Sequence, residues 1–526
     1  MFRTRAAVMG WCLAITALAP VGASALATHP AQVTSAAPGD KALDRSVAAK
    51  PPVGMLVVLQ RDLGLTEDQA RSRLLNEVRL APIAAQLRRR LGTRFAGSWL
   101  LEPTARTLVV ATTSPADLTE ITAQGARPLL VRRSLAELQA IKDRLAAGPL
   151  SSVSSVRYID VRTNKVIVRS ATPQAAAKIV RTTGLASDAV KVIASAEQPR
   201  SLPTTVRLLG PSADLTADLK IDLVGGQAYL TGAGTRCSIG FSVTHGDRKG
   251  FVSAGHCGTP NVTTVGFNRL PQGVVQASTF PGDDHSWVAV NDTWVPRPLV
   301  GNDSGGTIHV SGHRQAVEGA SVCLSGSSST GLNWRCGVIT QRDADVTYPQ
   351  GVVDHLIRTS TCGQAGDSGA AMLSVDQAQG VVSGGSGNCP DGGVTYVQPI
   401  GDTLTAYDLT LITDDTARMP STGVCTGYPQ TATGTLAGAQ SVYRPVGSPY
   451  RTTVAGNHYG CLNGRPDGDF DLYLQKQTGS VWNTVAASDS PQSFEELGYW
   501  GLPGDYRYMV LSSSGTGSYT LGYTTP

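Results

Sequence analysis

The chain has 526 residues, enough for about three or four domains, and a formal net charge of +4 with 16% charged residues. The basic residues are spread along the chain and form no cluster, so neither a nucleic-acid partner nor an acidic partner is expected. The 58 glycines and the short apolar runs predict turn-dense, β-rich domains and argue against a helical bundle.

The N-terminus has the three parts of a secretory signal peptide. Arg3 and Arg5 form a positive segment, residues 6–19 are apolar, and residues 25–27 form a small-residue cleavage site. A membrane anchor is the alternative, but the apolar run is too short to span a bilayer comfortably. We therefore expect residues 1–27 to be removed and the mature protein to be secreted, with no membrane contact.

Residues 28–220 contain no cysteine and are built differently from the rest. Residues 28–54 have the Ala/Pro/Ser-rich composition of a disordered leader. From Leu59 to Leu91 apolar residues recur at three- and four-residue steps, which predicts helix. Two strand–turn–strand–helix units then match one another, SWLLEPTARTLVVATTSPADLTEI and SVRYIDVRTNKVIVRSATPQAAAKIV. Each enters its helix through a proline, so two copies of an α+β unit are predicted; two unrelated hairpins are the alternative.

Residues 200–220 form a junction, and from Ile221 to about residue 413 the sequence changes to short strands, glycine turns and cysteines. Residues 414–423 are a polar linker, and residues 424–526 end in alternating strands of a last β-rich module. Removal of Cys12 with the signal peptide leaves an even number of cysteines, which implies disulfides in an exported chain, although spacing does not fix the pairing. They are Cys237, Cys257, Cys323, Cys336, Cys362, Cys389, Cys425 and Cys461.

The segment TCGQAGDSGA, residues 361–370, carries a candidate nucleophile. A serine hydroxyl is a poor nucleophile at neutral pH, so it needs a nearby base and donors for the oxyanion. Gly366 permits a tight turn that can aim the N–H groups of Gly366 and Ser368 at one point. Gly-Asp-Ser-Gly is also a common turn, so the interpretation depends on finding the base.

His256 is the candidate base, because it follows a strand in KGFVSAGHCG and lies beside a cysteine. Asp284, at the start of the apolar strand in PGDDHSWVAV, can be partly buried and can accept the other N–H of the imidazole. The order His, Asp, Ser fits the double-barrel proteases and not the subtilisin or α/β-hydrolase orders.

Residues 221–413 resemble the alpha-lytic protease and streptogrisin branch of the chymotrypsin-like family. The resemblance rests on CSIGFSVTHGDRKGFVSAGHCGT, FPGDDHSWVAV, VCLSGSSSTGLNWRCG, AGDSGA and QAQGVVSGGSGNC. It implies a mainly β fold with two six-stranded β-barrels and a cleft between them that holds the Ser-His-Asp triad. It also implies the disulfides Cys237–Cys257, Cys323–Cys336 and Cys362–Cys389.

The sequence departs from the family pattern at three places. Ala370 replaces a glycine, which is tolerable unless the backbone needs a positive φ. Leu324 replaces the arginine that would pair with the buried carboxylate of Asp367, so another cation such as Arg335 must substitute or the site must be wetter. Methionines that narrow the pocket in the alpha-lytic enzyme are replaced here by Gly363 and Val382.

These replacements predict a roomy, mostly apolar specificity pocket with no carboxylate for Lys or Arg and no polar group for Glu. We therefore expect a preference for Phe, Tyr, Leu or Met at P1, the residue before the cleaved bond. The substrate would also pair with the protein as an added strand. The predicted pocket walls are Gly363, Gln364, Ala365, Val382, Ser383, Gly384 and Gly385.

The flanking regions also resemble known domains. Residues 28–220 are similar to the family propeptide in GLTEDQARSRL, EPTARTLVV and TNKVIVRS, which implies an intramolecular chaperone and inhibitor cleaved near residues 219–221; a passive spacer is the alternative. Residues 424–526 resemble the pre-peptidase C-terminal β-sandwich, with a Cys425–Cys461 disulfide. Asp467, Asp469 and Asp471 alternate there, so they could bind Ca²⁺ or could simply be a turn entering a strand.

The sequence thus predicts a secreted, self-processing serine endopeptidase that acts through an acyl-enzyme, needs no cofactor, is monomeric and cleaves proteins and peptides. The competing hypothesis is a non-catalytic binding protein on a degenerate protease scaffold. A serine esterase would normally show Gly-x-Ser-x-Gly and the order Ser, Asp, His.

Overall fold

The computed structural model describes residues 54–525, except 102, 206–219, 233, 302–305, 329–333, 388, 390–391, 414–424, 426–427, 454–455, 466–467, 489–492 and 502. The expected signal peptide, almost all of the leader and the linker lie outside the described residues. No helix among those described combines the length and the apolar character needed to cross a bilayer.

The helical stretch predicted from Leu59 is two helices, α2 (Met55–Leu63) and α3 (Glu67–Leu91). Gly64 ends α2 with a left-handed φ of 65°, which glycine adopts without steric cost. Thr66 then begins α3: its side chain accepts the N–H of Gln69, and the Gln69 side chain accepts the N–H of Thr66. The two helices are therefore separated by a glycine cap followed by a capping box, which apolar periodicity alone does not reveal.

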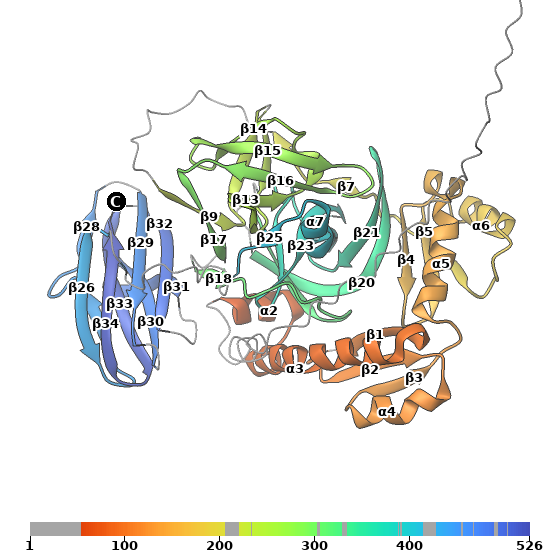
Figure 1. The fold of residues 1–526 in the computed structure, drawn as a ribbon, viewed down its shortest axis with the longest axis horizontal. Helices are drawn as coiled ribbons and strands as arrows, with labels where there is room; N and C mark the ends of the chain where they lie inside the picture. The colour runs from red at the N-terminus through yellow and green to blue at the C-terminus, as the bar shows by residue number, and fades with distance from the viewer. Residues whose placement is uncertain are drawn as a thin grey trace, which may run out of the picture. The chain divides into compact units, whose positions relative to one another are not determined.

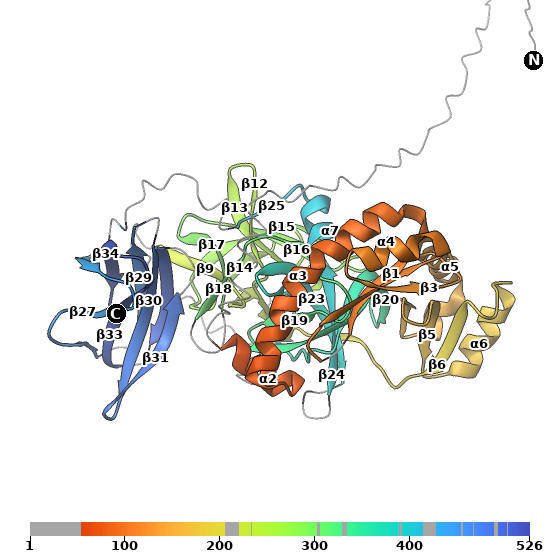
Figure 2. The same cartoon turned by 90° about the horizontal axis from the view of Figure 1, so that it is seen from below.

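The two matching units have the same strand pairing. In each, two antiparallel strands are followed by a helix and a third strand parallel to the second, which the sequence analysis did not predict. Helix α3 packs on β1 and β2 of the first unit (Figure 2). The first unit consists of β1 (Phe95–Leu101), β2 (Thr107–Thr112), α4 (Leu118–Ala123) and β3 (Arg127–Leu130). After α5 (Leu135–Ala146), the second consists of β4 (Val156–Asp160), β5 (Lys165–Ser170), α6 (Pro173–Thr182) and β6 (Val190–Ala194).

The central region, residues 221–413, contains two curved antiparallel β structures (Figure 1). The first is the sheet β12-β13-β16-β15-β14-β10-β11, with β9, β17 and β18 in a separate small sheet. The strands are β9 (Ile221–Gly225), β10 (Ala228–Thr231), β11 (Thr235–Ser238), β12 (Ser242–His245), β13 (Arg248–Ser253), β14 (Thr263–Gly266), β15 (Pro271–Thr279), β16 (His285–Val290), β17 (Trp294–Gly301) and β18 (Thr307–His309).

The second β structure is a closed six-stranded barrel, because β19 and β20, at the two ends of the order β19-β22-β23-β24-β21-β20, also pair. The helix and strand that follow return to the first sheet, where β25 pairs with β12. The elements are β19 (Ser321–Ser325), β20 (Trp334–Tyr348), β21 (Gly351–Thr359), β22 (Ala371–Ser374), β23 (Gln377–Gly387), β24 (Gly393–Pro399), α7 (Ile400–Ala406) and β25 (Thr410–Leu411).

Strands from before residue 221 extend both β structures of the central region. β4 pairs with β20, with Arg157 opposite Asp345. Two short strands, β7 (Arg200–Ser201) and β8 (Thr204–Thr205), pair with β23 and β11 respectively. The apolar cores are also shared, since Met55, Leu59 and Leu74 pack in one cluster with residues of the central region.

The C-terminal module is a two-sheet β-sandwich. One sheet has the order β26-β34-β29-β32, and the other has β27-β33-β30-β31 with β28 beside β33. A common core that includes Phe470, Tyr508 and Leu521 fills the space between them. The strands are β26 (Gln430–Leu436), β27 (Ser441–Arg444), β28 (Tyr450–Thr452), β29 (Gly456–Asn463), β30 (Asp469–Thr478), β31 (Val481–Ser488), β32 (Phe494–Gly501), β33 (Gly504–Ser514) and β34 (Gly517–Thr524).

Candidate active site

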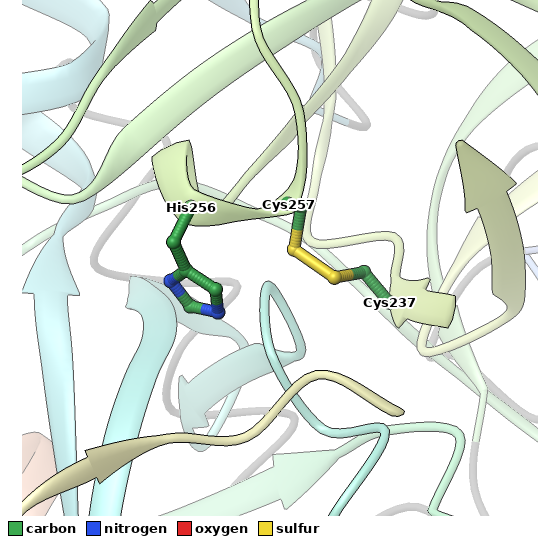
Figure 3. A group of neighbouring side chains, drawn as sticks. All are labelled: Cys237, His256 and Cys257. Atoms are coloured by element: carbon green, nitrogen blue, oxygen red, sulfur yellow. A yellow bond between two sulfur atoms is a disulfide. The ribbon is translucent and has the colours of Figure 1, made fainter. Parts of the chain in front are cut away.

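His256 lies on a single helical turn, η4 (Gly255–Cys257), directly after strand β13. The disulfide Cys237–Cys257 ties this turn to the end of β11, and Figure 3 shows the imidazole next to the bond. Gly255 is needed at the start of the turn, because a Cβ there would lie 2.0 Å from the carbonyl oxygen of Thr279. The histidine side chain therefore projects from a backbone fixed on both sides.

Asp284 is fully buried, lies immediately before β16, and contacts the ring nitrogen of His256 that does not face Ser368. Its carboxylate lies 2.8 Å from Nδ1 of His256 and also accepts the backbone N–H of His256 at 3.0 Å. Because a carboxylate can only accept, Nδ1 carries the ring proton and Nε2 is free to accept another. The Asp284 N–H donates to the side chain of Gln398, which fixes the loop.

The carboxylate oxygen nearest to Nδ1 of His256, Oδ2 of Asp284, also accepts a hydrogen bond from a chain of two hydroxyl groups. Ser383 Oγ donates to Asp284 Oδ2 at 2.6 Å, so its own lone pairs are left to accept from the hydroxyl of Tyr348 at 3.0 Å. Burial raises the pKa of Tyr348, which keeps this phenol protonated and able to donate. Ser383 was predicted as a pocket wall whose backbone pairs with the substrate, and the contact of its side chain with Asp284 adds a positioning role.

Ser368 Oγ lies 2.6 Å from Nε2 of His256. The structure thus brings together the three residues that the sequence put forward for the triad. Gly366 has a φ of 99° and Gly369 a φ of 80°, so the turn that presents the serine uses glycine where a left-handed backbone is required. Ala370 is not among the described positive-φ residues, so its methyl group fits without strain.

Asp367 is buried and is paired with Arg335 of β20. Arg335 and Leu324 are direct partners across the β19–β20 pair, so the cation comes from the neighbouring strand. Burial raises the pKa of the Asp367 carboxyl to about 6, and the charge of Arg335 opposes that rise. Arg335 also donates to the side chain of Gln364, and the backbone N–H of Gln364 donates to Asp367. Of the two alternatives left open above, the structure contains the substitute cation.

The site is occupied by the chain itself at Leu202. The Leu202 carbonyl accepts the N–H of Gly366 at 2.6 Å, and its own N–H donates to Ser368 Oγ at 3.0 Å. Its side chain fills the predicted pocket: a Cβ on Gly363 would lie 2.7 Å from Leu202 Cδ1, and one on Gly385 would lie 3.4 Å from it. Leu202 shares a buried cluster with Val382. Sequence reasoning did not identify this segment.

The other predicted pocket walls, Gly384, Gln364 and Ala365, have different surroundings. Gly384 contacts backbone, because a Cβ there would lie 2.4 Å from the carbonyl oxygen of Arg200. The Gln364 side chain accepts a hydrogen bond from Arg335 at 3.0 Å. Ala365 lies in the turn that follows Gln364.

The four disulfides join the predicted pairs, three of which the family resemblance implied and one of which was predicted for the C-terminal module. Those in the central region are Cys237–Cys257, Cys323–Cys336 and Cys362–Cys389, and the C-terminal module contains Cys425–Cys461. The sulfur atoms near His256 are therefore consumed in a covalent bond and are not thiolate ligands for a metal.

The acidic residues of β30 remain a predicted calcium site. Asp467 lies outside the described residues. Asp471 is buried, and its Oδ2 accepts hydrogen bonds from Ser513 and from Tyr473, so this oxygen already has protein partners.

Comparison with known proteins identifies the N-terminal part first. Residues 68–131 match the family "Alpha-lytic protease pro N-terminal", and residues 133–187 match "Alpha-lytic protease prodomain". Streptogrisin-C of Streptomyces griseus is 43% identical over 467 residues, which is 86% of this chain and 94% of that protein. Streptogrisin-D of the same organism is 33% identical over 337 residues, 62% of this chain and 78% of that protein.

Among solved structures, the chymotrypsin of Cellulomonas bogoriensis is 46% identical, covers 37% of this chain and 100% of its own, and has a TM-score of 0.34. The similarity to Streptogrisin-C extends over most of both chains and includes a prodomain of the alpha-lytic type. The chain therefore belongs to the alpha-lytic protease and streptogrisin family of chymotrypsin-like serine endopeptidases.

Proposed function

We propose that this chain is the precursor of a secreted endopeptidase that cleaves proteins after large apolar residues through an acyl-enzyme on Ser368. The observation that carries the proposal is the line of contacts from Asp284 through His256 to Ser368, with distances of 2.8 Å and 2.6 Å. The signal-peptide pattern of residues 1–27 supports secretion.

The geometry supports a two-step mechanism. Nε2 of His256 takes the proton of Ser368 as Oγ attacks the substrate carbonyl carbon, and Asp284 stabilises the imidazolium that forms. The oxyanion would be stabilised by the N–H groups of Gly366 and Ser368, a role supported by the donation of the Gly366 N–H to the Leu202 carbonyl at 2.6 Å. The imidazolium then gives its proton to the leaving amine, which leaves an ester on Ser368. Water activated by the same imidazole hydrolyses that ester and regenerates the hydroxyl.

Covalent labelling with a fluorophosphonate tests this function. We expect the secreted protein to hydrolyse casein and to be labelled at Ser368, because only an activated serine reacts rapidly with such a reagent. The Ser368→Ala variant, which removes one oxygen atom, should show neither reaction. An unlabelled and inactive wild-type protein would favour the competing hypothesis of a degenerate binding protein.

The P1 preference follows from the fit of Leu202 in the pocket. The side chain is 5% exposed, lies against Gly363 and Gly385, and belongs to the same buried apolar cluster as Val382. On a panel of peptides that differ only at P1, we expect kcat/KM for Leu, Phe, Tyr or Met to exceed that for Ala by about 10- to 200-fold. Steady-state kinetics would refute the preference if Arg, Glu or Ala gave the best substrate.

The N-terminal region would act as a chaperone and inhibitor of the same site. Arg73 and Glu77 of α3 form a buried ion pair, and both contact Ser321 at the start of β19. Asp62 of α2 accepts the N–H of Cys336, and Arg61 donates to the carbonyl of Trp334. These contacts hold the β19–β20 hairpin that carries Arg335. A helix-bound hairpin lowers the entropy cost of closing a barrel with long-range strand pairing.

A further inference from the structure

Residues 200–205 run extended through the site on both sides of Ser368. On the side that precedes Leu202, Ser201 lies opposite Gly384 and Arg200 lies opposite Gly385 in the antiparallel pairing of β7 with β23. Addition of an extended peptide to the edge of a sheet is a general mode of peptide recognition, in which main-chain hydrogen bonds hold the peptide and pockets take its side chains. Together with the Leu202 carbonyl at the N–H of Gly366, this pairing gives Leu202 the P1 position.

The chain continues unbroken on the other side of the site. Thr204 lies opposite Arg236 and Thr205 lies opposite Thr235, in the antiparallel pairing of β8 with β11. Arg236 precedes Cys237, whose disulfide fixes the His256 turn. Residues 200–205 therefore occupy positions before and after the bond that faces Ser368, as an intact substrate would. That bond joins Leu202 to Pro203.

We propose that residues 200–205 are a substrate-like inhibitor that the enzyme does not cleave, because Pro203 follows the bond presented to Ser368. The inference rests on the proposed function. It adds that the precursor is not cut at the bond between Leu202 and Pro203. The cut that frees the central region then lies downstream of residue 205. The propeptide it releases keeps an intact inhibitory segment.

The chemical reason lies in the leaving group. Cleavage requires Ser368 Oγ to bond to the Leu202 carbonyl carbon and the C–N bond to break, while Nε2 of His256 gives a proton to the leaving nitrogen. The nitrogen of Pro203 is part of a ring, and its Cδ methylene takes the place of the hydrogen of other residues. This methylene crowds the approach of the imidazole to the nitrogen, so the proton transfer and the C–N cleavage are both hindered.

The same proline favours binding. A residue before proline is restricted to extended backbone, which is the conformation that Leu202 needs in order to sit in the pocket. Less conformational freedom is then lost when the segment binds. Pro203 thus helps the segment bind and prevents it from being cut.

Substitution of Pro203 in the full-length precursor tests the inference. In the wild type, N-terminal sequencing and intact-mass analysis of the secreted material should find no fragment that begins at residue 203. In Pro203→Ala most of the precursor should be cut between residues 202 and 203. The double variant Pro203→Ala/Ser368→Ala should not be cut there, which excludes a contaminating protease.

A peptide assay with the secreted wild-type enzyme covers the case in which the variant precursor fails to fold. The peptide EQPRSLPTTVR, residues 197–207, should inhibit competitively and stay intact. The Pro203→Ala peptide should be cleaved after Leu202 at least about 100-fold faster, and a Leu202→Asp peptide should lose inhibition.

The outcomes separate this inference from the proposed function. Fluorophosphonate labelling of Ser368 together with rapid cleavage of the wild-type peptide after Leu202 would overturn the inference alone. Labelling together with equal resistance of the two peptides would also overturn it, because proline would then not be the cause. Failure of labelling and of casein hydrolysis would overturn both.

Discussion

Replacement of Asp284 by Asn is expected to lower kcat by about 10⁴-fold. The amide keeps the shape of the carboxylate, but its NH₂ group can donate to Nδ1 of His256, which then carries no proton. The ring proton moves to Nε2, where it blocks acceptance from Ser368 Oγ, now 2.6 Å away. Steady-state kinetics on a P1-Leu peptide would measure the loss, with folding checked by circular dichroism.

Asp283→Asn is the matched control for this prediction. The adjacent residue undergoes the same chemical change, and no contact joins it to His256 among the hydrogen bonds of the described residues. We expect its kcat to stay close to that of the wild type. An Asp284→Asn enzyme with unchanged kcat would show that the imidazole is oriented by another group.

Replacement of Arg335 by Leu is expected to cost about 3–5 kcal/mol of stability, because it leaves the buried carboxylate of Asp367 without its cation. The double variant Leu324→Arg/Arg335→Leu moves the charge to the directly opposite position on β19. We expect it to recover a large part of the loss, since cross-strand partners lie within reach of the same group. Urea unfolding in a Ser368→Ala background keeps the precursor intact during the measurement.

The same double variant also distinguishes a loss of protein stability from a loss of positioning of the Gly366 turn. If Arg335 acts through Asp367 on the turn of Gly366, then kcat of the active protein should fall in Arg335→Leu and return in the double variant, while KM changes less. Leu324→Arg alone places a second cation beside Arg335 and is expected to destabilise. If the double variant is as unstable and as slow as Arg335→Leu, the charge pair is not the reason for the loss.

The residues of the site could be found in the sequence because each lies in a short, distinctive segment. Ser368 stands in a glycine turn, His256 follows an apolar strand beside a cysteine, and Asp284 precedes another strand. The order of these segments also indicated the double-barrel fold. The unpredicted third strands, β3 and β6, are short and mostly half-buried or exposed, so their apolar pattern is weak: RPLL in β3 does not alternate, and VKVIA in β6 alternates over only three residues.

Contacts between distant segments were decided only by the tertiary structure. The role of Arg335 depends on its position opposite Leu324, which requires the register of β19 and β20. The hydroxyl chain from Tyr348 through Ser383 to Asp284 joins three separate strands or loops. Neither arrangement leaves a local pattern, because strand register places residues together without regard to their spacing in the chain.

By itself, the sequence determined the protease family, and it predicted the three groups of the triad and an apolar pocket, because each depends on residue type within a local segment. The tertiary structure decided which cation faces Asp367 and which bond faces Ser368. Only the pairing of β7 with β23 and of β8 with β11 places Leu202 and Pro203 at the nucleophile. That placement depends on long-range backbone hydrogen bonds, whose partners a linear sequence does not specify.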